Sequence, residues 1–195
     1  MYCDKTNTTP HTLTVSREDN VVIGDTRSGT LFVYTLIGRL FKTISLPEGA
    51  LAVGMKNICT DSQDNIVVAT HAKPYRLLRY TMRGKRVSDW PSPANMEQLA
   101  LTVTAEGVLV IACVDQIIVF DPVGRTTLGS FTTQHLFMVL EADTDKTFAA
   151  FDPDKKVLVK YSLAQFSGGA KKYQSVSEAH RSQKRGQKQL DIKRS

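Results

Sequence analysis

Six basic side chains lie within fourteen residues of one another near the middle of the chain. They are Lys73, Arg76, Arg79, Arg83, Lys85 and Arg86. Tyr75, Tyr80 and Trp90 lie among or beside them. Basic side chains can hold phosphates and aromatic rings can stack on bases, which is how proteins bind single-stranded nucleic acid. This stretch is therefore a candidate RNA-binding surface.

The same stretch also has a structural explanation. Side chains on a regular strand alternate between two faces, so Arg76 and Arg79, an odd number of positions apart, cannot line one surface. Charged side chains on an outer strand discourage pairing with other chains. We therefore favour a solvated sheet edge, with a binding patch as the alternative.

The C-terminal stretch holds all of the excess positive charge of the chain. Residues 170–195 contain eight of the 25 Lys and Arg but two of the 19 Asp and Glu, which leaves 17 of each in the rest. The basic residues are Lys171, Lys172, Arg181, Lys184, Arg185, Lys188, Lys193 and Arg194. Few apolar residues are present to offset the entropy of ordering, so we predict a disordered basic tail. It either aids solubility or serves nucleic-acid binding or nuclear import.

Motifs for catalysis or metal binding are missing from the sequence. It has no glycine-rich phosphate loop, nucleophile elbow or HExxH motif, and its four histidines do not have zinc spacing. Asp143 with Asp145, and Asp152 with Asp154, resemble calcium ligands but fall where hairpin turns are expected. We therefore expect neither a cofactor nor a metal, and no enzymatic activity.

The cysteines and the N-terminus indicate the compartment. Cys3, Cys59 and Cys113 are widely separated and form no CxxC pattern, so free thiols are expected. Cys59 and Cys113 fall in apolar runs, where small buried side chains are expected. No apolar run approaches the roughly 20 residues of a membrane span, and residues 1–11 have no signal-peptide core. We expect a cytoplasmic protein without membrane association, or a nuclear one if the tail directs it there.

Four units of about forty residues would position all of these side chains. The units align on an aromatic anchor, and the anchors are Tyr34, Tyr80, Phe120 and Tyr161, spaced 46, 40 and 41 residues apart. Three positions before the anchors are Leu31, Leu77, Ile117 and Leu158. Four positions after the first three anchors are Gly38, Gly84 and Gly124. Short apolar runs repeated with a period near forty are typical of β-propeller blades.

Each unit is predicted to be a four-stranded antiparallel meander. In the second unit we expect strands at 57–60, 65–70, 76–81 and 86–90, with residues that bind their own backbone in the turn after the first. We expect Gly84 in a two-residue hairpin turn, which requires positive φ. In the fourth unit only three strands are evident. The prediction is an all-β propeller with a lead-in at 1–12, blades at 13–47, 57–93, 98–133 and 136–166, and the tail at 167–195.

The units resemble the NHL repeat, in which an apolar strand ending in Asp-Thr precedes Arg-Ile-x-x-Phe and a turn glycine. The matching stretches are Asn20–Thr26 with Leu31–Tyr34 and Gly38, Asp64–Ala69 with Arg76–Tyr80 and Gly84, and Gly107–Ile111 with Ile117–Asp121 and Gly124. The resemblance covers about residues 13–163. The family arginine is matched only by Arg76 and the Asp-Thr pair only by Asp25 and Thr26, so the chain is similar to a divergent member.

The resemblance implies a non-catalytic module that recognises a protein. NHL propellers end tripartite-motif proteins, in which a RING and B-boxes supply ubiquitin ligase activity and the propeller selects the partner. Those zinc modules are missing from this sequence, so it would act only as the substrate-selecting part. RNA recognition by the second blade and the tail is the alternative, and a propeller enzyme with a central metal is a more distant one.

The number of units bears on assembly. NHL propellers usually have six blades, and four are visible here, the last incomplete. A ring lacking blades leaves unpaired strand edges. Self-association through these edges is therefore a further expectation.

Overall fold

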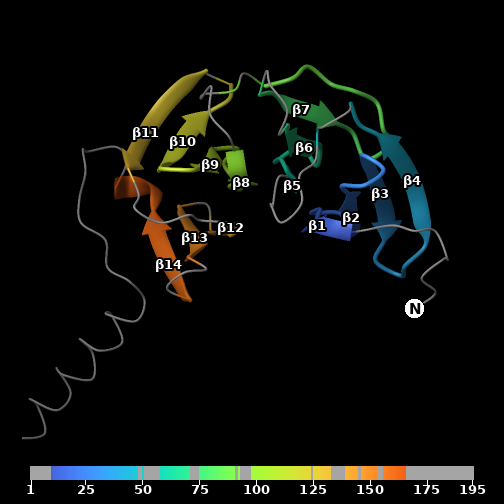
Figure 1. Ribbon diagram of the computed structural model, residues 1–195, viewed down its shortest axis with the longest axis horizontal. Helices are drawn as coiled ribbons and strands as arrows, with labels where there is room; N and C mark the ends of the chain where they lie inside the picture. The colour runs from blue at the N-terminus through green and yellow to red at the C-terminus, as the bar shows by residue number, and fades with distance from the viewer. Residues whose placement is uncertain are drawn as a thin grey trace, which may run out of the picture.

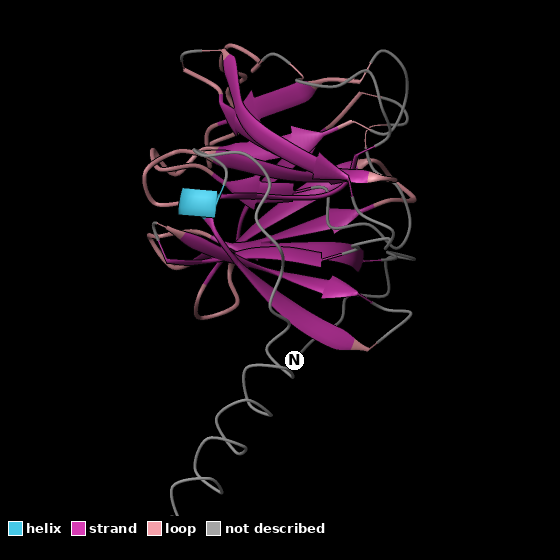
Figure 2. Cartoon of the chain, turned by 90° about the vertical axis from the view of Figure 1, so that its left-hand side faces the viewer, coloured by secondary structure: helices cyan, strands magenta, loops and turns pink. Residues whose placement is uncertain are grey.

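The computed structural model describes residues 10–47, 50, 58–70, 75–90, 92, 98–123, 125–132, 139–144, 146–152 and 156–165. These residues form strands joined by turns, and a single turn of 3-10 helix, η1 (Leu163–Gln165), follows the last strand. Figure 2 shows how completely strands dominate the fold. Within the described ranges, no helix is long and apolar enough to span a bilayer.

The strands form four antiparallel sheets, and each sheet follows the chain without a crossover. Blade 1 contains β1 (Pro10–Val15), β2 (Asn20–Asp25), β3 (Thr30–Thr35) and β4 (Leu40–Ser45). Blade 2 contains β5 (Ile58–Thr60), β6 (Ile66–Ala69) and β7 (Leu77–Tyr80). Blade 3 contains β8 (Gln98–Val103), β9 (Leu109–Cys113), β10 (Gln116–Asp121) and β11 (Thr126–Thr132). Blade 4 contains β12 (Val139–Thr144), β13 (Thr147–Asp152) and β14 (Val157–Ser162).

The four blades are arranged in an arc around a common centre. Figure 1 shows the first strand of each blade, β1, β5, β8 and β12, nearest the centre and the later strands farther out. Blades 1 and 4 stand at the two ends of the arc, separated by a wide opening. This arrangement confirms the predicted all-β fold of partial-propeller type.

The outer edge of blade 2 differs from the prediction. A fourth strand was expected at 86–90, but the structure has two isolated bridges there, Tyr80 to Arg86 and Leu77 to Trp90. Val87 N donates to Arg79 O and Trp90 N donates to Leu77 O. The acceptors Leu77 and Arg79 are two positions apart but the donors Val87 and Trp90 are three positions apart, so one extra residue interrupts the ladder.

The glycine turns confirm one prediction and correct another. Gly38 and Gly84 both have φ of +81°, as the pattern required. The predicted two-residue hairpin is wrong, because Gly84 N donates to Thr81 O and Thr81 N donates to Lys85 O, which makes a three-residue loop. A type I turn followed by a left-handed residue gives the strands the same favourable twist. Gly124 lies outside the described residues.

The core consists of apolar clusters between successive blades, and they explain the repeated motif. The anchor Tyr80 packs with residues of blade 1, whereas Leu77 packs with residues of blade 3. Phe120 likewise faces blade 2 and Ile117 faces blade 4. Positions three apart on a strand point to opposite faces. Blades 2 and 3 therefore pack the aromatic anchor on the preceding blade and the apolar residue three positions before it on the following blade.

Candidate binding surface

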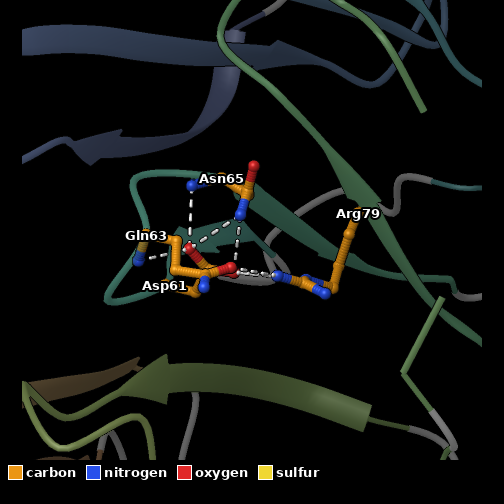
Figure 3. Close-up of polar contacts among 4 residues, drawn as sticks. All are labelled: Asp61, Gln63, Asn65 and Arg79. Carbon is orange, nitrogen blue, oxygen red and sulfur yellow. Dashed lines mark hydrogen bonds and ion pairs between the residues drawn. The ribbon is translucent and has the colours of Figure 1, made fainter. Parts of the chain in front are cut away.

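Arg79, one of the candidate binding residues, lies inside blade 2. Its Nη2 lies 2.6 Å and its Nε 3.2 Å from Oδ2 of Asp61, as Figure 3 shows. The two side chains are only 9% and 2% exposed. The guanidinium also lies over the ring of Trp90, 4.5 Å from its centroid. The charge of Arg79 is thus neutralised within the blade and does not face a partner.

Asp61 is held in place by the turn that it begins. Its Oδ1 accepts the backbone N–H groups of Gln63 at 2.9 Å and Asn65 at 2.8 Å. The side-chain amide of Asn65 donates to both carboxylate oxygens, at 3.2 and 3.1 Å (Figure 3). A buried carboxylate needs such partners to offset its lost hydration. The network therefore ties the β5–β6 turn to β7, and it confirms that this turn binds its own backbone.

The aromatic residues of the candidate patch are also used inside the fold. Tyr80 is buried against blade 1, and this burial raises the pKa of its phenol. Trp90 packs against the blade 2–blade 3 cluster and under Arg79. Tyr75 is half-buried. Tyr80 and Trp90 are therefore packing residues rather than exposed platforms for bases.

The exposed basic residues of blade 2 fall into two places. Arg76 precedes β7, whereas Arg83 and Lys85 lie in the turn that follows it, and all three are exposed. The four residues of β7 separate these ends by about 13 Å at the usual strand rise. Arg86 lies beside the turn and pairs with Asp89 at 2.7 Å. The structure thus brings Arg83, Lys85 and Arg86 together and leaves Arg76 apart.

A residue of blade 1 joins this group. A Cβ placed on Gly84 would lie 3.1 Å from Cε of Lys42 and 3.2 Å from Cγ1 of Ile44, both on β4. The stem of Lys42 therefore crosses the Gly84 turn, and its side chain is exposed. We call Lys42, Arg83, Lys85 and Arg86 the outer cationic turn. Asp89, the ion-pair partner of Arg86, is an acidic residue beside it.

Lys73 and the tail residues Lys171, Lys172, Lys184 and Arg185 lie outside the residues that the structure describes. Their assignment to a binding surface stays a prediction.

A second polar junction was not predicted from sequence. The backbone N–H of Arg17 donates to Oδ1 of Asp64 at 2.9 Å, and its Nη2 donates to the carbonyl of Ala105 at 3.2 Å. These residues belong to the first turns of blades 1, 2 and 3. A signal for it was the repeated turn itself, in which Asp19, Asp64 and Gly107 occupy the same position and all have positive φ. Arg17 thus ties three blades together near the centre of the arc.

The buried thiols lie in the core, and the described carboxylates are not grouped as metal ligands. Cys59 and Cys113 are buried in the core, as predicted. Burial, with a smaller effect of Asp115, raises the pKa of the Cys113 thiol to about 12, so it stays protonated at neutral pH. Over the described ranges, no three His, Cys, Asp or Glu side chains are grouped so that they could hold a metal ion.

Comparison with known proteins places the fold. No family model matches the chain, and no curated protein matches it significantly. Among solved structures, streptogramin B lyase matches with a TM-score of 0.65 and 13% identity, over 89% of this chain and 57% of that one. A Bacteroides caccae protein of unknown function matches with a TM-score of 0.62 and 15% identity, over 90% and 62%. The Cps50 (Swd1) β-propeller domain of Myceliophteria thermophila matches with a TM-score of 0.59 and 13% identity, over 85% and 56%.

These likenesses show a β-propeller fold. The chain spans only 56–62% of the length of these three structures, in keeping with the arc of blades. Membership of the NHL group stays a prediction that rests on the sequence motif.

Proposed function

We propose that the chain is a non-catalytic recognition module that binds an acidic segment of a protein partner through the outer cationic turn. The observation that carries this proposal is the convergence of Lys42 from blade 1 with Arg83, Lys85 and Arg86 from blade 2. Asp89 neutralises part of this charge through Arg86, which leaves a net positive surface. Exposed charges of this kind steer a partner of opposite charge and set its orientation.

The interior of blades 2 and 3 supports a binding role rather than a chemical one. Asp61 and Arg79, which could otherwise serve in catalysis, satisfy each other in the core. The high pKa of Cys113 makes that thiol a poor nucleophile at neutral pH. What blade 2 offers a partner is a hydrogen-bonded turn carrying exposed positive charge.

A pair of single substitutions tests the role of the turn. Arg83→Glu reverses a charge within the outer cationic turn, and Arg76→Glu makes the same change at the other end of β7. Binding of a polyglutamate peptide, measured by fluorescence anisotropy at low salt, should weaken at least about tenfold for Arg83→Glu, because charge pairs become repulsive. It should change little for Arg76→Glu. Equal effects of the two substitutions, or no binding by the unaltered chain, would contradict the proposal.

The NHL resemblance adds a narrower proposal, that the bound protein is a ubiquitination substrate. A RING-bearing ligase would then have to act on the bound protein. In a reconstituted reaction, ubiquitin transfer to the captured protein should depend on the chain and fall with Arg83→Glu. Transfer that is unchanged without the chain rejects this role and leaves protein binding in place.

RNA is the second candidate partner, because the outer cationic turn would also attract phosphates. The burial of Tyr80 and the packing of Trp90 count against base stacking at this place. If RNA binds, the logarithm of its affinity should fall with the logarithm of salt concentration, with a slope of about 0.7 for each phosphate contacted. RNA affinity that is undetectable at low salt removes this candidate. Loss of binding on deleting residues 170–195 assigns it to the tail.

A further inference from the structure

Blade 1 presents to solvent a face made of apolar side chains. Along β2 and β3 these side chains alternate with Val22, Leu31 and Val33, which pack on blade 2. Because neighbouring residues on a strand point to opposite faces, the apolar side chains of this face point away from blade 2. The face consists of Leu13, Val15, Val21, Ile23, Phe32 and Tyr34. Leu13 is 51% exposed, and each of the others is exposed or half-buried. We call this set the free face of blade 1.

The same positions are buried in the next two blades. In blade 2 they are Ile58, Thr60, Ile66, Val68, Leu78 and Tyr80. In blade 3 they are Leu101, Val103, Leu109, Ile111, Ile118 and Phe120. All of these except the half-buried Thr60 are buried, and the apolar ones pack in the clusters between blades. The free face of blade 1 therefore has the composition of a surface that a preceding blade covers.

The turn after β3 supports this independently. Leu36 in that turn is 67% exposed, whereas its equivalent in blade 2, Met82, is 9% exposed and packs on blade 1. Gly84 of blade 2 touches β4 of the preceding blade, but Gly38 of blade 1 has nothing near it. The exposed Leu36 side chain and the open space beside Gly38 both indicate that a neighbouring blade could pack on this side of blade 1.

Blade 4 has the complementary surface. In each interface inside the chain, the apolar residue three positions before the anchor faces the following blade, and Leu31, Leu77 and Ile117 are fully buried there. The equivalent residue of blade 4, Leu158, is 55% exposed, with Phe151 paired beside it on β13. Blade 4 thus exposes the kind of surface that, in the interfaces inside the chain, covers the following blade.

We propose that the free face of blade 1 docks on the exposed face of blade 4 of a second copy, head to tail. The contact would repeat the one that blades 1 and 2, 2 and 3, and 3 and 4 make within the chain. Such a contact joins different surfaces of the two copies, so it either closes a ring or extends. Two copies carry eight blades, within the usual range of about four to eight for closed propellers. The proposal does not depend on the outer cationic turn.

Sedimentation equilibrium of the full chain tests the proposal. Unaltered protein should show a mass of two or more chains. Leu13→Lys and Leu158→Lys should each weaken association at least about tenfold, because a buried, unpaired charge opposes docking. Val123→Lys, at an 87% exposed site in the β10–β11 turn, is the matched control and should leave the mass unchanged. Leu36→Lys is a second variant of blade 1, and circular dichroism checks that every variant is folded.

Mixing the two variants distinguishes head-to-tail docking from other modes. Leu158→Lys protein keeps an intact blade 1 face and Leu13→Lys protein keeps an intact blade 4 face, so an equal mixture should form a one-to-one dimer. The proposal is overturned if the unaltered chain remains single up to about 0.1 mM. It is also overturned if Leu158→Lys protein associates like the unaltered chain, since another surface would then cover blade 1.

Discussion

The buried ion pair of blade 2 gives the sharpest prediction about stability, because the same chain contains an exposed pair of nearly equal length. Arg79 and Asp61 approach to 2.6 Å with side chains 9% and 2% exposed. Arg86 and Asp89 approach to 2.7 Å with side chains 47% and 29% exposed. Asp61→Asn and Asp89→Asn remove the same charge with nearly the same shape. The difference between them measures the effect of burial.

The expected magnitudes differ several-fold. Asp61→Asn leaves the Arg79 guanidinium buried without a counter-charge, which typically costs about 3–5 kcal/mol. Asp89→Asn breaks a pair that water and salt already screen, which costs about 0–1 kcal/mol. Arg79→Met should cost less than Asp61→Asn, because Asp61 keeps the N–H groups of Gln63 and Asn65. The double variant Asp61→Asn with Arg79→Met should cost less than the sum of the two single changes.

Urea unfolding followed by far-UV circular dichroism measures these differences at one protein concentration. With an m-value of about 2 kcal/mol per molar urea, Asp61→Asn should lower the midpoint by about 1.5–2.5 M. Asp89→Asn should lower it by less than about 0.5 M. Equal midpoints for the two variants would refute the argument that burial makes the Asp61 pair essential.

Further predictions concern the turns and the thiols. Gly84→Ala and Gly38→Ala both place a Cβ at φ of +81°, but only Gly84→Ala meets a neighbouring blade, so it should be the more destabilising by about 1 kcal/mol in urea titrations. Equal losses would remove the proposed contact between the Gly84 turn and β4. Because the pKa of Cys113 is about 12, on the order of one Cys113 thiol in ten thousand is ionised at pH 8. Iodoacetamide at pH 8 should therefore label it only after unfolding, as peptide mass mapping would show; rapid labelling of the folded chain would contradict this.

The blades could be predicted from the sequence because the features that form each one lie close together in the chain. Apolar runs and an aromatic anchor recur in each unit, and a turn glycine recurs in the first three. The odd spacing between Leu77 and Tyr80 already determines that they face different neighbours. The buried pair was not predicted, since Asp61 and Arg79 are eighteen residues apart and meet only when β5–β7 form a sheet. Lys42 was missed for a similar reason, because its contact with the Gly84 turn crosses from one blade to the next. The charge pattern identified the basic residues of blade 2, but it did not predict which of their side chains are exposed and which are buried.

Hydroxyl-radical footprinting of the four anchors tests most directly the claim that each blade packs its aromatic residue on the preceding blade. In dilute protein, Tyr80, Phe120 and Tyr161 should be protected and Tyr34 should be oxidised, because only Tyr34 belongs to the free face. In concentrated protein Tyr34 should become protected as well. Oxidation of Tyr80 or Phe120 in the folded chain, or protection of Tyr34 at every dilution, would contradict the account.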